Sequence, residues 1–220
     1  MLYIVGTPIG NLQDFSERGK ETLRSVELVL CEDTRVTGIL LAAFSIETPR
    51  ESMHEHTDTA KIQKLVSRLE QGENMAFVSD AGTPGVSDPG GKLVQAAAAA
   101  GVEIVAVPGP SALATAMSLA DFPVVPMTFL GFPPQKKGRD TFFRKLKEID
   151  HAIVLYESKH RIEKTLAFLP YQRYTMLGRE LTKKFETVYR GTPPELLERL
   201  SKGSQKGEYV IVIAPKNWKI

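Results

Sequence analysis

The first half of this chain alternates short apolar runs with loops, and this alternation limits its fold more than any other feature. Residues 2–5, 27–31, 75–78 and 102–107 are apolar runs of strand length, bounded by turn residues. Stretches of helical character lie between or after them, at residues 16–25, 37–44, 60–71, 88–101 and 111–119. Strands that alternate with helices form right-handed crossovers and a parallel sheet. The sequence therefore predicts an α/β fold.

A pair of prolines divides the chain. Pro123 and Pro126 suit neither a helix nor a central strand, so residues 121–126 are interpreted as a hinge. Beyond it, strands are expected at residues 128–132, 152–156, 174–178 and 209–214, with helices at 140–149, 160–169 and 194–202. We therefore expect two α/β domains, at residues 1–120 and 121–220.

Composition limits the compartment and the chemistry. The chain has 220 residues and one cysteine, Cys31, inside an apolar run, which indicates a buried thiol and a reducing compartment. No apolar stretch approaches the ~18 residues of a membrane span, and no basic segment precedes the first apolar run as in a signal peptide. A cytoplasmic protein without a membrane segment is expected. His54 and His56 have no third ligand nearby, so no metal is expected.

The net charge of +2 conceals an uneven distribution. Residues 1–118 hold 9 Lys or Arg against 15 Asp or Glu, a net charge of −6, and residues 119–220 hold 19 against 11, a net charge of +8. The basic residues are densest around a Pro/Gly loop and the helix after it, at Lys136, Lys137, Arg139, Arg144 and Lys145. They form either a solvated helix face or a surface that binds nucleic acid.

The loops that follow the first-half strands have the character of a ligand site. Six of the ten residues 82–91 are Gly or Pro, and residues 6–10, 32–35 and 108–112 follow three other strands. The carboxyl ends of parallel strands share one edge, where ligands bind in open α/β sheets. The Walker and dinucleotide glycine patterns are both absent, which favours a flat, mostly uncharged ligand such as an adenosine. Tight turns for packing are the alternative.

Two acidic residues of these loops have competing interpretations. Asp80 ends its strand and either accepts a hydrogen bond from a ligand or caps its own turn. Asp88 precedes Pro89, a pairing typical of a helix N-cap followed by proline at the first helical position.

Nine segments in order along the chain resemble one family. They are residues 7–12 (TPIGNL), 32–35 (EDTR), 52–56 (SMHEH), 79–90 (SDAGTPGVSDPG), 108–112 (PGPSA), 131–134 (GFPP), 156–161 (YESKHR), 178–183 (GRELTK) and 206–208 (KGE). Together they are similar to the bacterial 16S ribosomal RNA (cytidine 2′-O)-methyltransferases of the tetrapyrrole methylase-like superfamily, which use S-adenosylmethionine. Lys159 stands where that family pattern has proline.

The resemblance implies two α/β domains, the first with a mainly parallel sheet and the second with a mixed sheet, and S-adenosylmethionine in a cleft between them. It also implies a homodimer that acts on 16S rRNA in the small ribosomal subunit. The cofactor residues that it implies are Pro8, Ile9, Asp80, Ala81, Gly82, Thr83, Ser111, Ala112 and Tyr156.

Several residues are candidates for catalysis and RNA contact. A general base should assist a ribose hydroxyl, and the candidates are His56 and the cluster Glu32, Asp33 and Arg35, which is alternatively a structural ion pair. Lys183 is a candidate either as a cation that lowers the pKa of the hydroxyl or, if burial depresses its own pKa, as the base. RNA contacts are expected from Lys136, Lys137, Arg139, Arg144, Lys145 and Arg161. A tetrapyrrole-type small-molecule methyltransferase and a non-catalytic adenosine-binding protein remain alternative functions.

Asp80→Ala is expected to weaken S-adenosylmethionine binding, because it removes a carboxylate from the loop that the resemblance places against the cofactor. Calorimetric titration without RNA measures this affinity directly. Equal affinities for the variant and the wild-type chain would remove Asp80 from the site.

Overall fold

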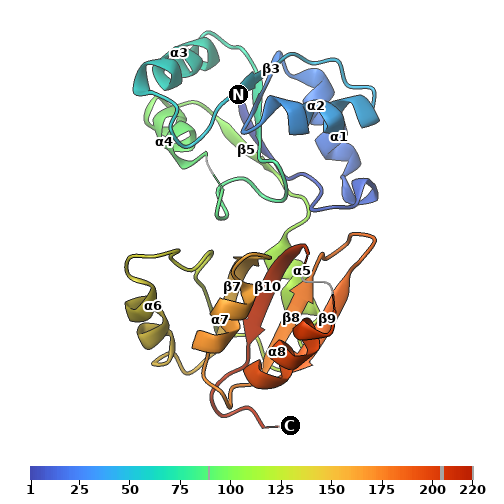
Figure 1. The fold of residues 1–220 in the computed structure, drawn as a ribbon. Coiled ribbons are helices and arrows are strands. Elements are labelled where there is room, and N and C mark those ends of the chain that lie inside the picture. Colours follow the sequence, from blue (N-terminus) through green and yellow to red (C-terminus); the bar gives the residue numbers. More distant parts are fainter. Residues whose placement is uncertain (89, 204–205, 220) are drawn as a thin grey trace. The chain divides into compact units, whose positions relative to one another are not determined.

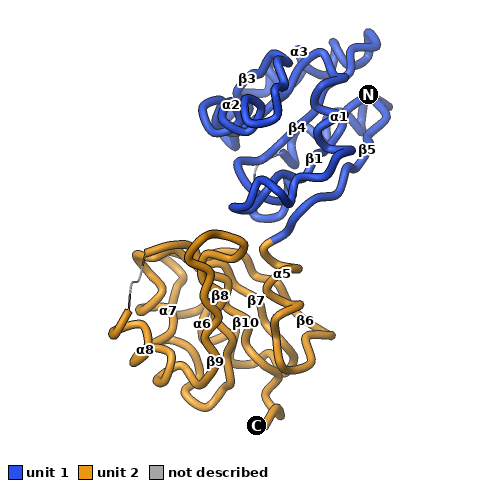
Figure 2. The backbone as a smooth tube through the Cα atoms, turned by 90° about the vertical axis from the view of Figure 1, so that its right-hand side faces the viewer, with its two compact units in different colours: residues 1–111 blue, residues 112–220 orange. Residues whose placement is uncertain are grey.

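Two compact units make up the chain, residues 1–111 and residues 112–220 (Figure 2). The structure, a computed structural model, describes residues 1–88, 90–203 and 206–219. The division falls before the helix α5 (Ala112–Ser118), which contacts the last strand of the second unit. The hinge that the prolines suggest at residues 121–126 therefore lies inside the second unit.

The first unit is a parallel sheet with helices on both faces (Figure 1). Its strand order is β3-β2-β4-β1-β5, and every neighbouring pair is parallel, as predicted. The strands are β1 (Leu2–Val5), β2 (Leu28–Cys31), β3 (Arg50–Ser52), β4 (Met75–Val78) and β5 (Ile104–Val107). The helices are α1 (Glu17–Ser25), α2 (Thr34–Ala43), α3 (Thr59–Glu70) and α4 (Gly91–Ala99), with a short 3-10 helix at Leu12–Asp14.

Alternation along the central strands fills both cores of this unit. Leu28 and Leu30 pack in the cluster that holds α3 and α4, whereas Val29 and Cys31 pack in the cluster that holds α1 and α2. Successive strand residues face opposite sides, so a strand covered on both faces is apolar throughout. The buried thiol predicted for Cys31 is confirmed, and burial raises its pKa.

The second unit holds a mixed sheet, as the resemblance implied. Its order is β6-β7-β10-β8-β9; β6 and β7 are parallel and the other pairs antiparallel. The strands are β6 (Met127–Phe129), β7 (Ala152–Ser158), β8 (Thr175–Arg179), β9 (Thr187–Gly191) and β10 (Glu208–Ile213). One face packs against α6 (Arg139–Leu146), α7 (Ile162–Phe168) and α8 (Pro193–Ser201), and the other against α5.

Some expected boundaries are wrong for local reasons. Helix α4 begins at Gly91 with Gly90 as its N-cap, so the prediction that Asp88 caps this helix is wrong; the expected first helical residue, Pro89, lies outside the described residues. A Cβ on Gly90 would lie 2.5 Å from the Phe77 ring, and its φ of +128° suits glycine. Helix α2 begins earlier than expected, because Asp33 accepts a hydrogen bond from the Arg35 N–H at 2.8 Å.

Strands β3 and β9 were not predicted from the sequence. Both lie at sheet edges and have few fully buried side chains, so neither shows the apolar run of a central strand. Among the described residues, no helix has the length and apolar character that crossing a membrane requires.

The backbones of two glycines come very close together where the loops after β1 and β5 begin. A Cβ built on Gly109 would lie 2.6 Å from the carbonyl oxygen of Gly6, and one on Gly6 would lie 2.7 Å from the Gly109 nitrogen. These neighbours are backbone atoms and cannot rotate away. Only glycine on both sides permits this approach.

Gly109→Ala is expected to lower the free energy of unfolding by about 1–3 kcal/mol, because the added methyl group forces two backbone segments apart. Thermal melting of the variant measures the loss. Gly91→Ala is the matched control, since a Cβ there meets nothing within 4 Å, and it is expected to be neutral or slightly stabilising. Equal melting temperatures for Gly109→Ala and the wild-type chain would contradict the prediction.

Candidate functional site

The loops at the carboxyl edge of the first sheet converge, as their placement predicted. Thr7 and Gly82 exchange two backbone hydrogen bonds of 2.8 and 3.1 Å, which join the loops after β1 and β4. The Thr83 hydroxyl donates to the Pro110 carbonyl at 3.4 Å. The Asp33 N–H donates to the Asp80 carboxylate at 3.1 Å and brings in the loop after β2.

The first-unit residues expected to bind the cofactor lie within these joined loops. Pro8 and Ile9 are buried directly after the Thr7 bridge, whereas Asp80 and Ala81 are exposed. Gly82 has a φ of +84°, and a Cβ there would touch the Ile9 side chain at 3.4 Å. This glycine-rich edge presents backbone groups without bulky side chains, which fits a flat adenosine.

The remaining cofactor candidates lie at the junction and in the second unit. Ser111 ends the first unit, and Ala112 begins α5 of the second. The Tyr156 hydroxyl accepts a hydrogen bond from the Leu113 N–H at 3.1 Å, so Tyr156 lies beside the start of α5. Its ring makes edge contacts with Phe129 and Phe132, at centroid distances of 4.9 and 5.6 Å.

Asp33 and Arg35 form an ion pair, and Glu32 does not share it. The Arg35 guanidinium donates to both Asp33 oxygens, at 3.1 and 2.6 Å. These side-chain hydrogen bonds lower the pKa of Asp33 to about 2, so Asp33 is ionised near neutral pH and a weak base. This pair favours the structural alternative, because Asp33 also caps α2.

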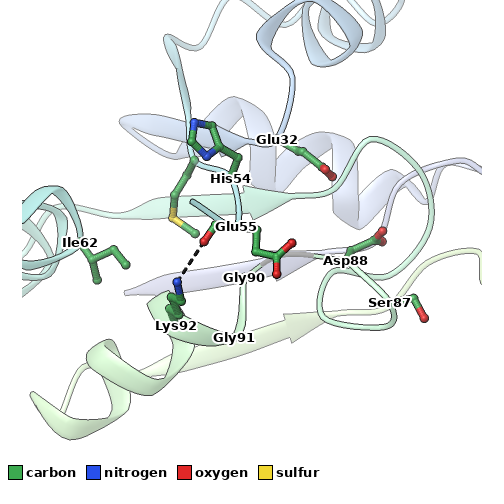
Figure 3. A pocket seen from close by; sticks show the side chains of 10 residues that line it. Glu32, His54, Glu55, Ile62, Ser87, Asp88, Gly90, Gly91 and Lys92 are labelled. Carbon is green, nitrogen blue, oxygen red and sulfur yellow. Dashed lines mark hydrogen bonds between the residues drawn. The ribbon is translucent and has the colours of Figure 1, made fainter. Parts of the chain in front are cut away.

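Glu32 instead lines a pocket of about 440 Å³ at the same edge of the sheet (Figure 3). The pocket lies over the ends of β2 and β3 and the start of α4. Its wall combines carboxylates, one lysine and apolar side chains, from Glu32, Met53, His54, Glu55, Ile62, Ser87, Asp88, Gly90, Gly91 and Lys92. The Lys92 ammonium donates to the Glu55 carbonyl at 3.0 Å, and burial raises the pKa of Glu32.

Asp88, wrongly predicted to cap α4, is one of the residues that line this pocket. Burial raises its pKa to about 6, against the opposing effect of a hydrogen bond with the Ser79 side chain. A carboxyl with this pKa changes its protonation near neutral pH, which is the property of a general base. The sequence favoured a helix N-cap over a site role for Asp88 because proline follows it, and an Asp-Pro pair is typical of a helix start.

The two histidines occupy different surroundings. Both side chains are exposed, but His54 lines the pocket and His56 does not; their ring centroids are 6.4 Å apart. In the part of the chain that the structure describes, no three His, Cys, Asp or Glu side chains are grouped so as to hold a metal ion.

Lys183 lacks the depressed pKa that a role as general base would require. Its ammonium contacts Glu180 at 3.0 Å and Glu208 at 2.8 Å. Burial alone would lower the pKa of Lys183, but the hydrogen bonds to both carboxylates raise it above the usual value. Lys183 is therefore protonated at neutral pH and cannot accept a proton from a hydroxyl.

The basic residues of the second unit separate into an exposed and an inward-facing set. Lys136, Lys137, Arg144 and Lys145 are exposed on and after the loop of residues 132–138. Arg139 and Arg161 are only partly exposed and donate to protein groups. Four of the six residues expected to contact RNA are therefore exposed and can contribute to a basic surface.

Comparison with known proteins gives one consistent result. The family model described as tetrapyrrole (corrin/porphyrin) methylases matches residues 1–197. Proteins named ribosomal RNA small subunit methyltransferase I are similar to this chain. The one from Synechocystis sp. is 42% identical over 97% of this chain and 78% of its own length, and the one from Escherichia coli O157:H7 is 41% identical over 96% and 77%.

Solved structures show the same fold at low identity. A diphthine synthase matches 97% of this chain and 89% of its own with a TM-score of 0.74 and 15% identity. A cobalt precorrin-4 methyltransferase matches 97% and 94% with a TM-score of 0.69 and 17% identity.

Asp88→Asn is expected to raise the melting temperature at pH 8 but not at pH 4. The folded-state pKa of about 6 lies above the ordinary aspartate value of 3.8, so the folded chain binds more protons between these values and loses stability as pH rises through about 6. Asparagine removes this cost because it carries no charge. Thermal melting at both pH values measures the effect, with the exposed Asp14→Asn as control; a gain equal at both pH values would contradict it.

Proposed function

The chain belongs to the tetrapyrrole methylase family, and we propose that it methylates small-subunit ribosomal RNA as its ribosomal RNA small subunit methyltransferase I relatives are named to do. The methyl donor is S-adenosylmethionine. The acceptor we propose is the ribose 2′-hydroxyl of a cytidine in 16S rRNA. The family match across residues 1–197 is the observation that carries this proposal.

The joined loops of the first unit support the position of the donor. We place the adenosine against the edge formed by Pro8, Ile9 and residues 80–83, with further contacts from Ser111, Ala112 and Tyr156. The Thr7–Gly82 bridge fixes the spacing of the first two loops. A preformed backbone edge of this kind binds without first paying the entropy of loop ordering.

The pocket beside these loops supports the position of the acceptor. Methyl transfer is an in-line displacement in which the 2′ oxygen forms a bond to the methyl carbon as the carbon–sulfur bond breaks. The hydroxyl proton must then pass to a base, and we propose Asp88 for this role because its pKa of about 6 leaves it ionised at neutral pH. Base catalysis of this kind typically contributes about 10²–10⁴-fold.

The charge of the second unit favours RNA over the alternative substrates. A tetrapyrrole-type small molecule needs only a compact basic pocket, whereas Lys136, Lys137, Arg144 and Lys145 are spread over a loop and a helix and are exposed. Spread cations suit a phosphate backbone. A non-catalytic adenosine-binding protein would not need a base with a raised pKa.

We propose a homodimer that acts in the cytoplasm on the small ribosomal subunit, as the family resemblance implies. The buried, unpaired Cys31 is compatible with a reducing compartment.

The test is transfer of labelled methyl groups from S-adenosylmethionine to small ribosomal subunits, with free 16S rRNA and a porphyrinoid as parallel acceptors. We expect label on RNA at a ribose. The rate should rise with pH through about 6, and Asp88→Asn should lower kcat by about 10²–10⁴-fold with unchanged cofactor affinity.

Each alternative gives a different result in this experiment. Label on the porphyrinoid alone would favour the small-molecule methyltransferase, and cofactor binding with no transfer would favour the non-catalytic protein. Full activity of Asp88→Asn would leave the proposed reaction intact and remove Asp88 as its base.

A further inference from the structure

A fully buried carboxylate in the second unit is not used by the proposed reaction. The Glu157 side chain lies near the end of β7 with none of its surface exposed. Its oxygens accept hydrogen bonds from the Ser158 N–H at 2.8 Å and the Thr165 hydroxyl at 2.6 Å, and lie 2.8 Å from the Arg161 guanidinium. A buried charge persists only when it is paired and hydrogen-bonded in this way.

Two arginines extend this cluster to one loop. Arg161 pairs with Glu157 and donates to the Pro133 carbonyl at 3.2 Å. Arg139 donates to the Thr165 hydroxyl at 2.7 Å and to the Pro134 carbonyl at 3.0 Å. The Pro133 carbonyl is thereby connected to Glu157 through Arg161, and the Pro134 carbonyl is connected to Glu157 through Arg139 and the Thr165 hydroxyl.

The loop so anchored is residues 132–138, here named the lysine loop. It lies between β6 and α6. At the start of α6 the Arg139 guanidinium carbon also lies 4.9 Å from the centroid of the Phe143 ring and 5.3 Å from that of the Phe168 ring. Lys136 and Lys137 lie between Pro134 and Arg139 and are both exposed. The hydrogen-bonded proline carbonyls before them and the Arg139 side chain after them thus hold the loop on both sides and leave the lysine side chains in solvent.

We propose that Glu157 is a positioning residue for RNA binding: through Thr165, Arg161 and Arg139 it fixes the lysine loop so that Lys136 and Lys137 meet the phosphate backbone of an RNA. The inference rests on the proposed function for the identity of the partner. Arg139 and Arg161, which the sequence suggested as RNA contacts, then support the loop from within the protein. A loop ordered before binding costs less entropy on binding than one ordered by the RNA.

The variants Thr165→Val and Glu157→Gln disturb the positioning of the lysine loop but leave the charges of Lys136 and Lys137 in place. Thr165→Val removes the hydroxyl that links Arg139 to Glu157 and keeps the side-chain shape; Glu157→Gln removes the charge. We expect both to weaken small-subunit rRNA binding by about tenfold, as for a few residues that must be ordered on binding. The slope of log affinity against log salt should stay at the wild-type value, because the same lysines contact the phosphates.

Lys136→Ala/Lys137→Ala is the comparison variant. It is expected to weaken binding and also to reduce the salt slope by roughly 1–2, since each lost phosphate contact removes about 0.7–0.9. Hydrogen exchange without RNA should show faster exchange of the lysine-loop amides in Thr165→Val and Glu157→Gln. Glu163→Gln, an exposed carboxylate change on the same helix, should leave exchange and binding unchanged.

A variant with a general structural defect would also bind S-adenosylmethionine more weakly. The affinity for this cofactor, measured by calorimetry, should be unchanged in all four variants. Wild-type RNA affinity in both Thr165→Val and Glu157→Gln would overturn the inference, and so would an equal loss of cofactor affinity. Failure of the wild-type chain to bind small-subunit RNA would overturn the proposed function and the RNA part of this inference. The exchange measurement would then still decide whether Glu157 holds the loop.

Discussion

The close approach of the Gly6 and Gly109 backbones is the constraint on which the first unit's site depends. Strands β1 and β5 are paired neighbours, and their following loops must both leave the same edge of the sheet. With any side chain at either position the loops would separate. The two backbone hydrogen bonds between Thr7 and Gly82 join the loop after β4 to these two, so that three loops form one surface made largely of backbone.

Much of this arrangement could be predicted from the sequence, because it follows from burial and turn chemistry. The strands β1, β2, β4 and β5 are apolar on both faces or end in glycine and proline loops, and both signals are local. Parallel strands then bring their loops to one edge without further information. The edge strands β3 and β9 escaped prediction because exposure removes the apolar signal.

The chemistry of individual side chains was predictable only in part. Because Asp33 and Arg35 are only two residues apart, a structural ion pair between them could be predicted from the sequence as an alternative to a catalytic role. The environments of Asp88 and Lys183 depend on residues distant in sequence: Ser79 beside Asp88, and Glu208 beside Lys183. A pKa is set by such neighbours and by burial, and neither can be predicted from the local sequence.

The same limit applies to charge counted along a chain. The excess of +8 in residues 119–220 correctly indicates a basic unit, but a count treats every guanidinium as available to a partner. Arg139 and Arg161 direct their donors to Thr165, Glu157 and two loop carbonyls. Arginine suits this task because its planar fork donates in several directions at once. The lysines between these anchors have flexible stems and compact charges, which suit contact with phosphates in solvent. Around this loop, Arg139 and Arg161 therefore hold the backbone, whereas Lys136 and Lys137 keep their ammonium groups in solvent.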